Sequence, residues 1–165
     1  MGYYNGISKG YAELYGDEQL EKAKAIAKLI QPKKNEKLLD VGCGDGAYLH
    51  LFNCDITGVD TSSELLKIAK KNNPKAGFVL AKAEELPFKE NSFDFVISVT
   101  AVHNFDDIEN GLKEMERVAK SKVVLSILKR SPKFSSIQGY IEDIFEVEKK
   151  IELEKDVVFV LEKIF

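Results

Sequence analysis

A glycine-rich turn is the part of this sequence whose residue types and spacing are best suited to binding a ligand. Residues 38–46 read Leu-Leu-Asp-Val-Gly-Cys-Gly-Asp-Gly, an apolar run followed by glycines at alternate positions. Glycine is needed where φ is positive or where a ligand must lie against bare backbone. A helix that follows such a turn points its unpaired N–H groups at the ligand. The pattern therefore predicts a nucleotide-like ligand at the carboxyl end of the first strand of an α/β sheet, next to Gly42, Gly44 and Gly46.

A distant acidic residue strengthens this interpretation. Residues 55–60 read as a strand that ends in Asp60, twenty positions after Asp40. A carboxylate there can accept hydrogen bonds from both ribose hydroxyls of an adenosine, which suits either NAD or S-adenosylmethionine. Two features of the turn favour S-adenosylmethionine: Asp40 precedes the glycines, where it can lie near a cationic amino acid tail, and the glycine spacing departs from Gly-x-Gly-x-x-Gly. A third is the pair of downstream segments at 84–88 and 91–96, Glu-Glu-Leu-Pro-Phe and Asn-Ser-Phe-Asp-Phe-Val.

Four segments together resemble the class I S-adenosylmethionine-dependent methyltransferases, and most closely the small ubiquinone/menaquinone-biosynthesis-like (type 11) group. They are residues 39–46, 58–60, 83–88 and 92–96. The resemblance covers roughly the whole chain, and its motifs are specific for the cofactor rather than for the methyl acceptor. It implies a three-layer αβα sandwich around a seven-stranded, mostly parallel, Rossmann-like sheet whose last strand is antiparallel. It also implies S-adenosylmethionine as donor and S-adenosylhomocysteine as product.

The resemblance assigns a role to several side chains. Asp40 would interact with the cofactor's amino group, Asp60 would hold the ribose, and Leu86 or nearby backbone would face the adenine. Further cofactor-binding positions that it implies are Tyr11, Cys43, Thr61, Ala83, Glu84 and Val99. One position departs from the family pattern, because Lys82 stands where an aspartate commonly accepts a hydrogen bond from the adenine amino group. A lysine cannot accept a hydrogen bond, so we expect cofactor affinity in the micromolar range and not tighter.

His103 is the candidate for proton transfer. It follows the fourth expected strand, at the carboxyl edge of the sheet, where a histidine could take a proton from an acceptor O–H or N–H. The alternative is a loop histidine bonded to backbone. Lys129, Arg130 and Lys133 fall at the same edge and could receive an anionic acceptor such as phosphate, carboxylate or RNA backbone, or form a solvated loop. No residue is expected to bind a metal.

Hydrophobic periodicity predicts alternating strands and helices. The expected strands are residues 37–41, 55–60, 76–81, 93–99, 122–128, 147–153 and 157–165, with a turn at 154–156 between the last two. The expected helices are residues 17–31 with Asp17 as N-cap, a short one at 47–52, 61–71 opened by a Thr-Ser-Ser-Glu capping box, one capped by Asp106 or Asp107 that runs to 119, and 135–144. The tyrosine-rich residues 3–15 are either a flap over the ligand or a segment docked on the sheet edge.

Length and composition indicate a single methyltransferase domain over residues 1–165, with a helical flap and helix at 1–31 and the cofactor-binding sheet core at 37–165. The chain has 44% hydrophobic residues and a net charge of −3, which provides no general attraction to nucleic acid or anionic lipid. Neither an apolar run near ~18 residues nor a signal-peptide pattern is found, so a cytoplasmic location is expected. The two cysteines form neither a disulfide framework nor a metal set.

The expected function is methyl transfer from S-adenosylmethionine to an unidentified small molecule, RNA or protein. The connection between the fifth strand and the last helix is short, where family members often carry an insertion that recognises the acceptor. We therefore expect an open site, a large acceptor, or an activator or substrate-recognition partner that completes the pocket. The alternatives are a non-catalytic S-adenosylmethionine-binding or regulatory module and, less favoured, an NAD(P)-binding oxidoreductase.

Overall fold

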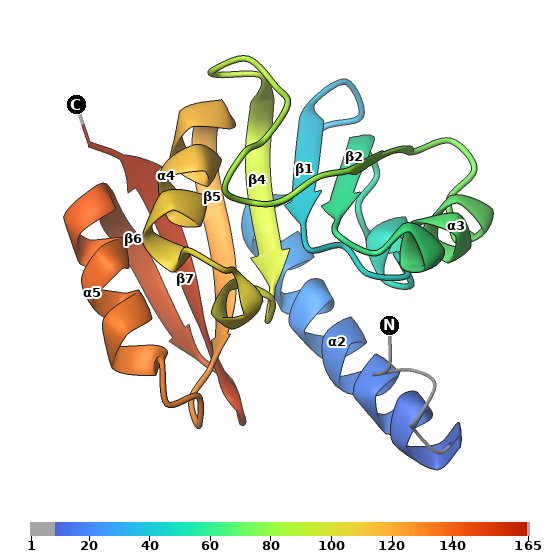
Figure 1. Ribbon diagram of the computed structural model, residues 1–165, viewed down its shortest axis with the longest axis horizontal. Coiled ribbons are helices and arrows are strands. Elements are labelled where there is room, and N and C mark those ends of the chain that lie inside the picture. Colours follow the sequence, from blue (N-terminus) through green and yellow to red (C-terminus); the bar gives the residue numbers. More distant parts are fainter. Residues whose placement is uncertain (1–8, 165) are drawn as a thin grey trace.

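The computed structural model describes residues 9–164, with side chains from residue 16 onward (Figure 1). The tyrosine-rich segment that was expected to form a flap or a docked segment lies largely outside the described residues. Tyr11 falls within the first described helix, but its side chain is not described, so its predicted contact with the cofactor stays a prediction.

Seven strands form one sheet in the order β3-β2-β1-β4-β5-β7-β6. They are β1 Lys37–Val41, β2 Asp55–Asp60, β3 Gly77–Leu80, β4 Phe93–Val99, β5 Ala119–Leu128, β6 Phe145–Glu152 and β7 Asp156–Lys163. Strands β3, β2, β1, β4 and β5 pair in parallel, whereas β7 is antiparallel to both of its neighbours. The predicted fold, with an antiparallel last strand, is confirmed.

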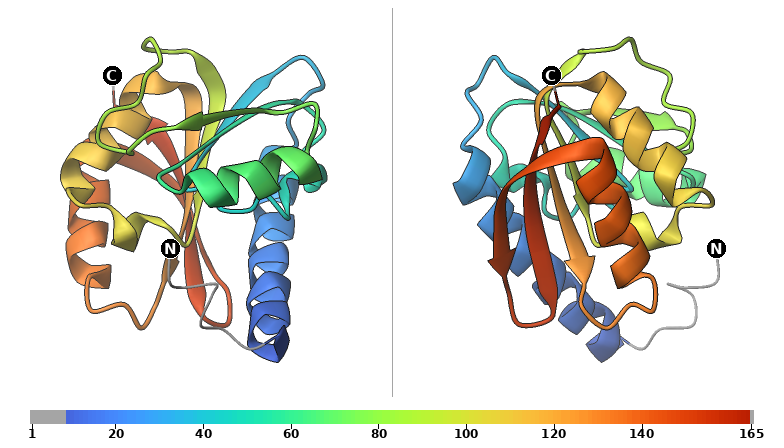
Figure 2. Two further views of the ribbon diagram at one scale, coloured as in Figure 1. Left: turned by 45° about the vertical axis from the view of Figure 1, so that its right-hand side comes forward. Right: turned by 90° about the vertical axis from the view of Figure 1, so that its left-hand side faces the viewer.

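Helices cover both faces of the sheet, so the molecule has three layers (Figure 2). They are α2 Lys9–Ile30, α3 Ser63–Asn72, α4 Ile108–Val118 and α5 Phe134–Ile144, with short 3-10 helices at Leu49–Leu51 and Val102–Asn104. Side chains alternate between the two faces along each strand, so adjacent residues enter different cores. Leu38 belongs to the same buried cluster as Ile26 of α2, whereas Leu39 belongs to the cluster that includes Leu112 of α4 and Ile137 of α5.

The first helix is longer than predicted, and this matters for the site. Helix α2 begins at Lys9, so Asp17 lies inside it, exposed, and is not its N-cap. The apolar positions from Leu20 to Ile30 indicated only the part of the helix that packs on the sheet. The preceding turns project past the carboxyl ends of β1 and β4 (Figure 1), where no core imposes periodicity on the sequence.

The other helix ends differ from prediction by small shifts. Ser62, not Thr61, caps α3, because its hydroxyl accepts a hydrogen bond from the backbone N–H of Leu65 at 3.2 Å. Asp107 caps α4 in the same way, accepting from Asn110 N at 3.1 Å, which resolves the predicted choice between two aspartates. The short helix expected at 47–52 is a single 3-10 turn.

The last hairpin differs from the prediction at one residue, which contributes to the buried polar network described below. Asp156, predicted to lie in the turn, begins β7 and pairs with Leu128 of β5. Its carboxylate is fully buried. A buried charged residue is rare unless it is paired, so its neighbours are part of the site.

Candidate functional site

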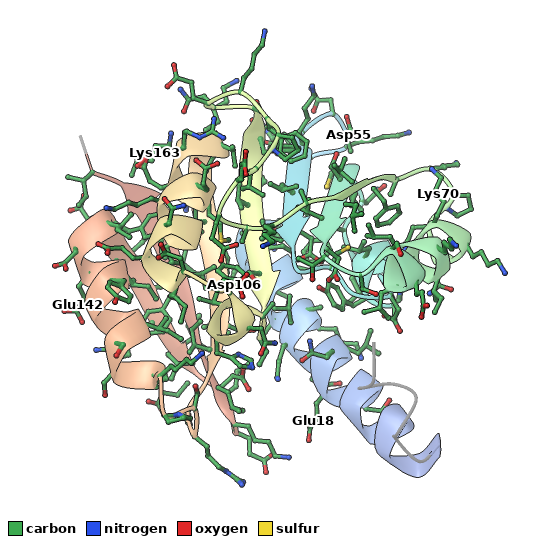
Figure 3. The ribbon with its side chains drawn as sticks, viewed as in Figure 1. Glu18, Asp55, Lys70, Asp106, Glu142 and Lys163 are labelled. Carbon is green, nitrogen blue, oxygen red and sulfur yellow. The ribbon has the colours of Figure 1, made fainter. Side chains whose placement is uncertain are left out.

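A cavity of about 810 Å³ lies at the carboxyl ends of the parallel strands, where open α/β sheets bind their ligands. Figure 3 shows two of its lining residues, Glu18 on α2 and Asp106 on the segment between β4 and α4. Most of the predicted site residues line this one cavity: Gly42, Cys43, Gly44, Asp60, Thr61, Ala83, Glu84, Val99 and His103. Asp40 and Gly46 were predicted with them but do not line it. The structure therefore brings together residues that lie as far apart in the sequence as Gly42 and His103.

The three glycines of the turn all have positive φ, but the space next to each of them differs. Their φ values are 81°, 55° and 66° for Gly42, Gly44 and Gly46. A Cβ on Gly42 would lie 2.6 Å from the Cβ of Ala101, and one on Gly46 would lie 2.8 Å from Nδ2 of Asn73. A Cβ on Gly44 would meet nothing within 4 Å. Packing thus accounts for the first and third glycine, whereas Gly44 leaves open space above the backbone, as a ligand requires.

Asp60 connects the end of β2 to the glycine turn. Its Oδ2 accepts a hydrogen bond from Gly44 N at 2.9 Å, and its Oδ1 accepts one from Ser62 N at 3.0 Å. A carboxylate has about four acceptor positions, so each oxygen can accept a further bond from a ligand hydroxyl. The backbone N–H groups thus fix the carboxylate in place while leaving it able to hold a ribose.

Asp40 lies beneath the turn, fully buried at the end of β1. The Tyr48 hydroxyl donates a hydrogen bond of 2.5 Å to its Oδ2. Its Oδ1 is buried and has no hydrogen-bond partner among the residues that the structure describes. Burial raises the pKa of Asp40 to about 7, the Tyr48 bond lowers it, and the charge of Asp60 raises it. A buried acid with one unpartnered oxygen fits the ammonium group of a cofactor's amino acid tail.

Tyr48 was not predicted as a site residue, although its position offered a signal. It comes two residues after Gly46, so the turn that carries the glycines also returns the tyrosine ring to the end of β1. Tyr48 belongs to the same buried cluster as Leu38 and Phe52, and it also lines the cavity.

The adenine side of the predicted site is built differently from the expectation. Lys82 is exposed, and its ammonium lies 3.5 Å from the carboxylate of Asp106. Glu84 accepts a hydrogen bond from the backbone N–H of Asp107 at 2.9 Å, which ties this segment to the start of α4. Leu86 is buried in the core and does not line the cavity, because its backbone bonds to side chains of α4 turn it inward. Ala83 remains at the cavity wall.

His103 lies in the 3-10 helix after β4 and lines the cavity. Burial lowers its pKa, as do the charges of Lys133 and Lys22, and the charge of Asp156 raises it in part. The net direction favours a neutral ring, which can accept a proton. The Lys133 ammonium donates a hydrogen bond of 3.0 Å to the backbone carbonyl of His103, so this lysine braces the loop.

The predicted basic cluster does not act as a unit. None of Lys129, Arg130 and Lys133 lines the cavity. Lys129 is paired with Glu152 at 3.0 Å, and Lys133 is bonded to backbone. The structure therefore favours the solvated-loop interpretation of these residues over an anion-binding site.

A buried polar network fixes α2 at the edge of the cavity, and the sequence did not indicate it. The Lys22 ammonium donates hydrogen bonds to Gln19 Oε1 at 3.1 Å and Thr100 Oγ1 at 3.0 Å. It also forms an ion pair with Asp156 Oδ1 at 3.1 Å, although this oxygen accepts no hydrogen bond from the described residues. Thr100 donates to the other Asp156 oxygen at 2.8 Å, and Gln19 donates to the carbonyl of Val99 at 3.2 Å. The network joins α2 to the ends of β4 and β7.

Comparison with known proteins decides the family. A family model described as "Methyltransferase domain" matches residues 39–127, which is more than half of the chain. The chain belongs to this methyltransferase family. The matched region begins in β1 and ends in β5, so it includes both aspartates of the turn and the loop of His103. The predicted resemblance to class I methyltransferases is confirmed.

A curated relative of this methyltransferase domain is the demethylmenaquinone methyltransferase of Thermotoga maritima. The two are 36% identical over 114 residues, which cover 66% of this chain and 50% of the relative. The chain spans about half the length of the curated relatives that it matches first.

Solved structures share the fold at low sequence identity. The PH0226 protein of Pyrococcus horikoshii matches with a TM-score of 0.82 and 18% identity over 99% of each chain. A putative methyltransferase from Haloferax volcanii, solved in complex with the Trm112 methyltransferase activator, gives 0.80 and 15% over 95% of each chain. Magnesium protoporphyrin IX methyltransferase of Synechocystis, solved with bound S-adenosylmethionine, gives 0.74 and 15% over 91% of this chain and 81% of that one.

Two other expectations concern metal binding and membrane-spanning helices. Among the residues that the structure describes, no group of three or more His, Cys, Asp and Glu side chains is arranged to hold a metal ion. No described helix combines the length and the apolar character that crossing a membrane requires. The cytoplasmic location stays a prediction.

Proposed function

We propose that this chain transfers a methyl group from S-adenosylmethionine to an acceptor and releases S-adenosylhomocysteine. The observation that carries the proposal is the pair of carboxylates next to the glycine turn, of which Asp60 lines the cavity and Asp40 lies buried beneath the turn, behind the cavity wall. Asp40 offers a buried, unpartnered oxygen, which suits an ammonium group, and Asp60 offers a fixed carboxylate, which suits ribose hydroxyls. An adenosyl amino acid carries both groups.

The same pair argues against the oxidoreductase alternative. A dinucleotide would bring its pyrophosphate to the glycine turn, close to the buried Asp40 carboxylate. Like charges in a poorly solvated place repel each other strongly, and Asp40 has no cation among the described residues to offset this.

When bound, S-adenosylmethionine would supply an electrophilic methyl group on a sulfonium. The residues of this chain would then act by positioning and by excluding water. Helix α2, fixed by Lys22, provides one wall of the cavity through Gln19 and Glu18. His103, kept neutral by burial, would accept the proton from the acceptor's O–H or N–H as the bond to the methyl group forms.

The acceptor side is open because the connection between β5 and α5 is only residues 129–133. The first acceptor to test is demethylmenaquinone, because the T. maritima relative is named as a demethylmenaquinone methyltransferase. The second possibility is a partner protein that completes the pocket, which the Haloferax volcanii complex with an activator makes worth testing. Full activity of the purified chain alone on a small acceptor would reject the need for such a partner.

The decisive experiment combines binding and turnover. Calorimetric titration with S-adenosylhomocysteine should give a micromolar dissociation constant, and NADH should fail to compete. Methyl-labelled donor should then be screened with demethylmenaquinone, tRNA and protein extracts. Binding without label transfer to any pool would favour the non-catalytic module, whereas absence of binding would refute the cofactor assignment.

A further inference from the structure

Only one of the two Asp40 carboxylate oxygens accepts a hydrogen bond from the described residues. The Tyr48 hydroxyl bonds to Oδ2, while Oδ1 is buried and has no hydrogen-bond partner among the described residues. Leaving a buried acceptor unsatisfied costs free energy, so such an atom in a folded protein calls for an explanation, and a missing ligand is one. The oxygen without a hydrogen bond, Oδ1, is therefore the one that we expect to interact with a ligand.

Burial restricts the movement of the Tyr48 ring. The residue is only 6% exposed and belongs to the buried cluster that includes Leu49, Phe52 and Ile26 of α2. The backbone around it is held as well, since Leu51 N donates to the Tyr48 carbonyl at 3.1 Å. A phenol fixed in this way directs its O–H at one carboxylate oxygen and leaves the other directed elsewhere.

We propose that Tyr48 is a positioning residue for cofactor binding: its hydroxyl favours the ionised form of Asp40 and orients it so that the free oxygen receives the ammonium group of the cofactor's amino acid tail, directly or through a water molecule. The inference rests on the proposed function and adds to it a residue outside the glycine motif. Without the phenol, the carboxyl group could rotate and bind a proton in the buried space instead of the ligand.

The groups around Asp40 disfavour its ionised form, so the hydrogen bond from Tyr48 is needed to offset them. Burial and the charge of Asp60 both raise the pKa of Asp40, and the Tyr48 bond is what lowers it. Cys43, in the turn, is kept as a neutral thiol because burial raises its pKa. The buried ammonium of Lys22 is engaged elsewhere, since it donates to Gln19 and Thr100 and pairs with the Asp156 carboxylate at 3.1 Å.

The test is the binding of S-adenosylhomocysteine to the wild type and to Tyr48→Phe between pH 6 and 9, measured by calorimetry. Removing a hydrogen bond to a charged group should shift the proton affinity of Asp40 by roughly tenfold. The variant should thus bind about tenfold more weakly at pH 6, with the difference almost gone at pH 9. A purely structural defect would weaken binding by the same factor at every pH.

Methylthioadenosine is the matched control ligand, because it keeps the adenosine and lacks the amino acid tail. Its affinity should be the same for both proteins at each pH. An equal loss for both ligands, a pH-independent loss, or no loss would each overturn the role of Tyr48. If the wild type itself fails to bind S-adenosylhomocysteine at any pH, the proposed function falls together with this inference.

A second measurement does not depend on the variant folding. In the wild type, the hydroxyl proton of Tyr48 should give an exchange-protected NMR signal, and this signal should persist when S-adenosylhomocysteine is added. Its disappearance on binding would show that the phenol leaves Asp40 in the complex, which would overturn the proposal.

Discussion

Removing the charge of Lys22 should destabilise the protein far more than removing any surface lysine. The side chains of Lys22 and Asp156 are 10% and 0% exposed, and their ammonium and carboxylate groups are 3.1 Å apart. In Lys22→Met the stem still packs, but the Asp156 carboxylate keeps only the bond from Thr100. Breaking a buried pair by removing one partner costs about 3–5 kcal/mol. For a domain of this length, that corresponds to a fall in Tm of roughly 6–20 °C.

The same helix provides a matched control. Lys24 is paired with Glu21 at 3.4 Å, and their side chains are 48% and 74% exposed. Because an exposed pair of this kind is worth little, Lys24→Met should change the free energy of unfolding by less than about 0.5 kcal/mol. Urea unfolding monitored by circular dichroism measures both variants.

A third variant separates the charge from the shape of the site. Adding Asp156→Asn to Lys22→Met removes the unpaired buried charge, while the amide oxygen can still accept from Thr100. The double variant should therefore be more stable than Lys22→Met alone. If Lys22→Met costs no more than Lys24→Met, the buried network does not hold α2 on the sheet, and the reasoning is wrong.

Three further predictions concern the cavity. Asp60→Ala should weaken binding of S-adenosylhomocysteine by roughly 10- to 100-fold without unfolding the chain, because a charged acceptor is lost; unchanged affinity by calorimetry would remove Asp60 from the site. His103→Asn should lower kcat by about 10²-fold or more while cofactor affinity stays the same, which label transfer and calorimetry can separate. The third is that the free energy of unfolding should fall by up to about 4 kcal/mol as pH rises from ~4 to ~7, because burial raises the pKa of Asp40 to about 7 and the folded state then binds the proton more tightly than the unfolded chain. Asp40→Asn should flatten this slope in urea unfolding; an unaltered slope would assign the pH dependence to other groups.

Local patterns allowed the sheet and the glycine turn to be predicted from the sequence. Strand β4 was predicted with its observed ends, because a strand buried on both faces is a continuous apolar run. The residues of the turn could be recognised because positive φ restricts the choice of residue at three alternate positions. The position of the cavity followed from the topology, since parallel strands place their carboxyl ends at one edge.

The groups that complete the site could not be predicted, because their partners are remote in sequence. Lys22 and Thr100 are 78 positions apart, and Thr100 and Asp156 are 56 apart. Nothing in the neighbouring sequence distinguishes Lys22 from the other lysines of the same helix. Asp156 is of a residue type that is common in turns, and it was therefore predicted to lie in one. Leu86 was expected at the cavity for the complementary reason: its motif indicated the segment but not which of its residues turns inward.

The two buried acids of this edge show why the same chemical group can serve two purposes. Asp156 is paired with the Lys22 ammonium at 3.1 Å and accepts a hydrogen bond from Thr100, so its charge is balanced within the protein, although its Oδ1 accepts no hydrogen bond from the described residues. Asp40 has a single neutral donor and no paired cation among the described residues, so its charge is compensated only by a proton or by a cation of the ligand. Both carboxylates are equally buried, and the difference between a structural acid and a binding acid therefore lies in the partners. This contrast supports Asp40, rather than Asp156, as the acid that receives the cofactor.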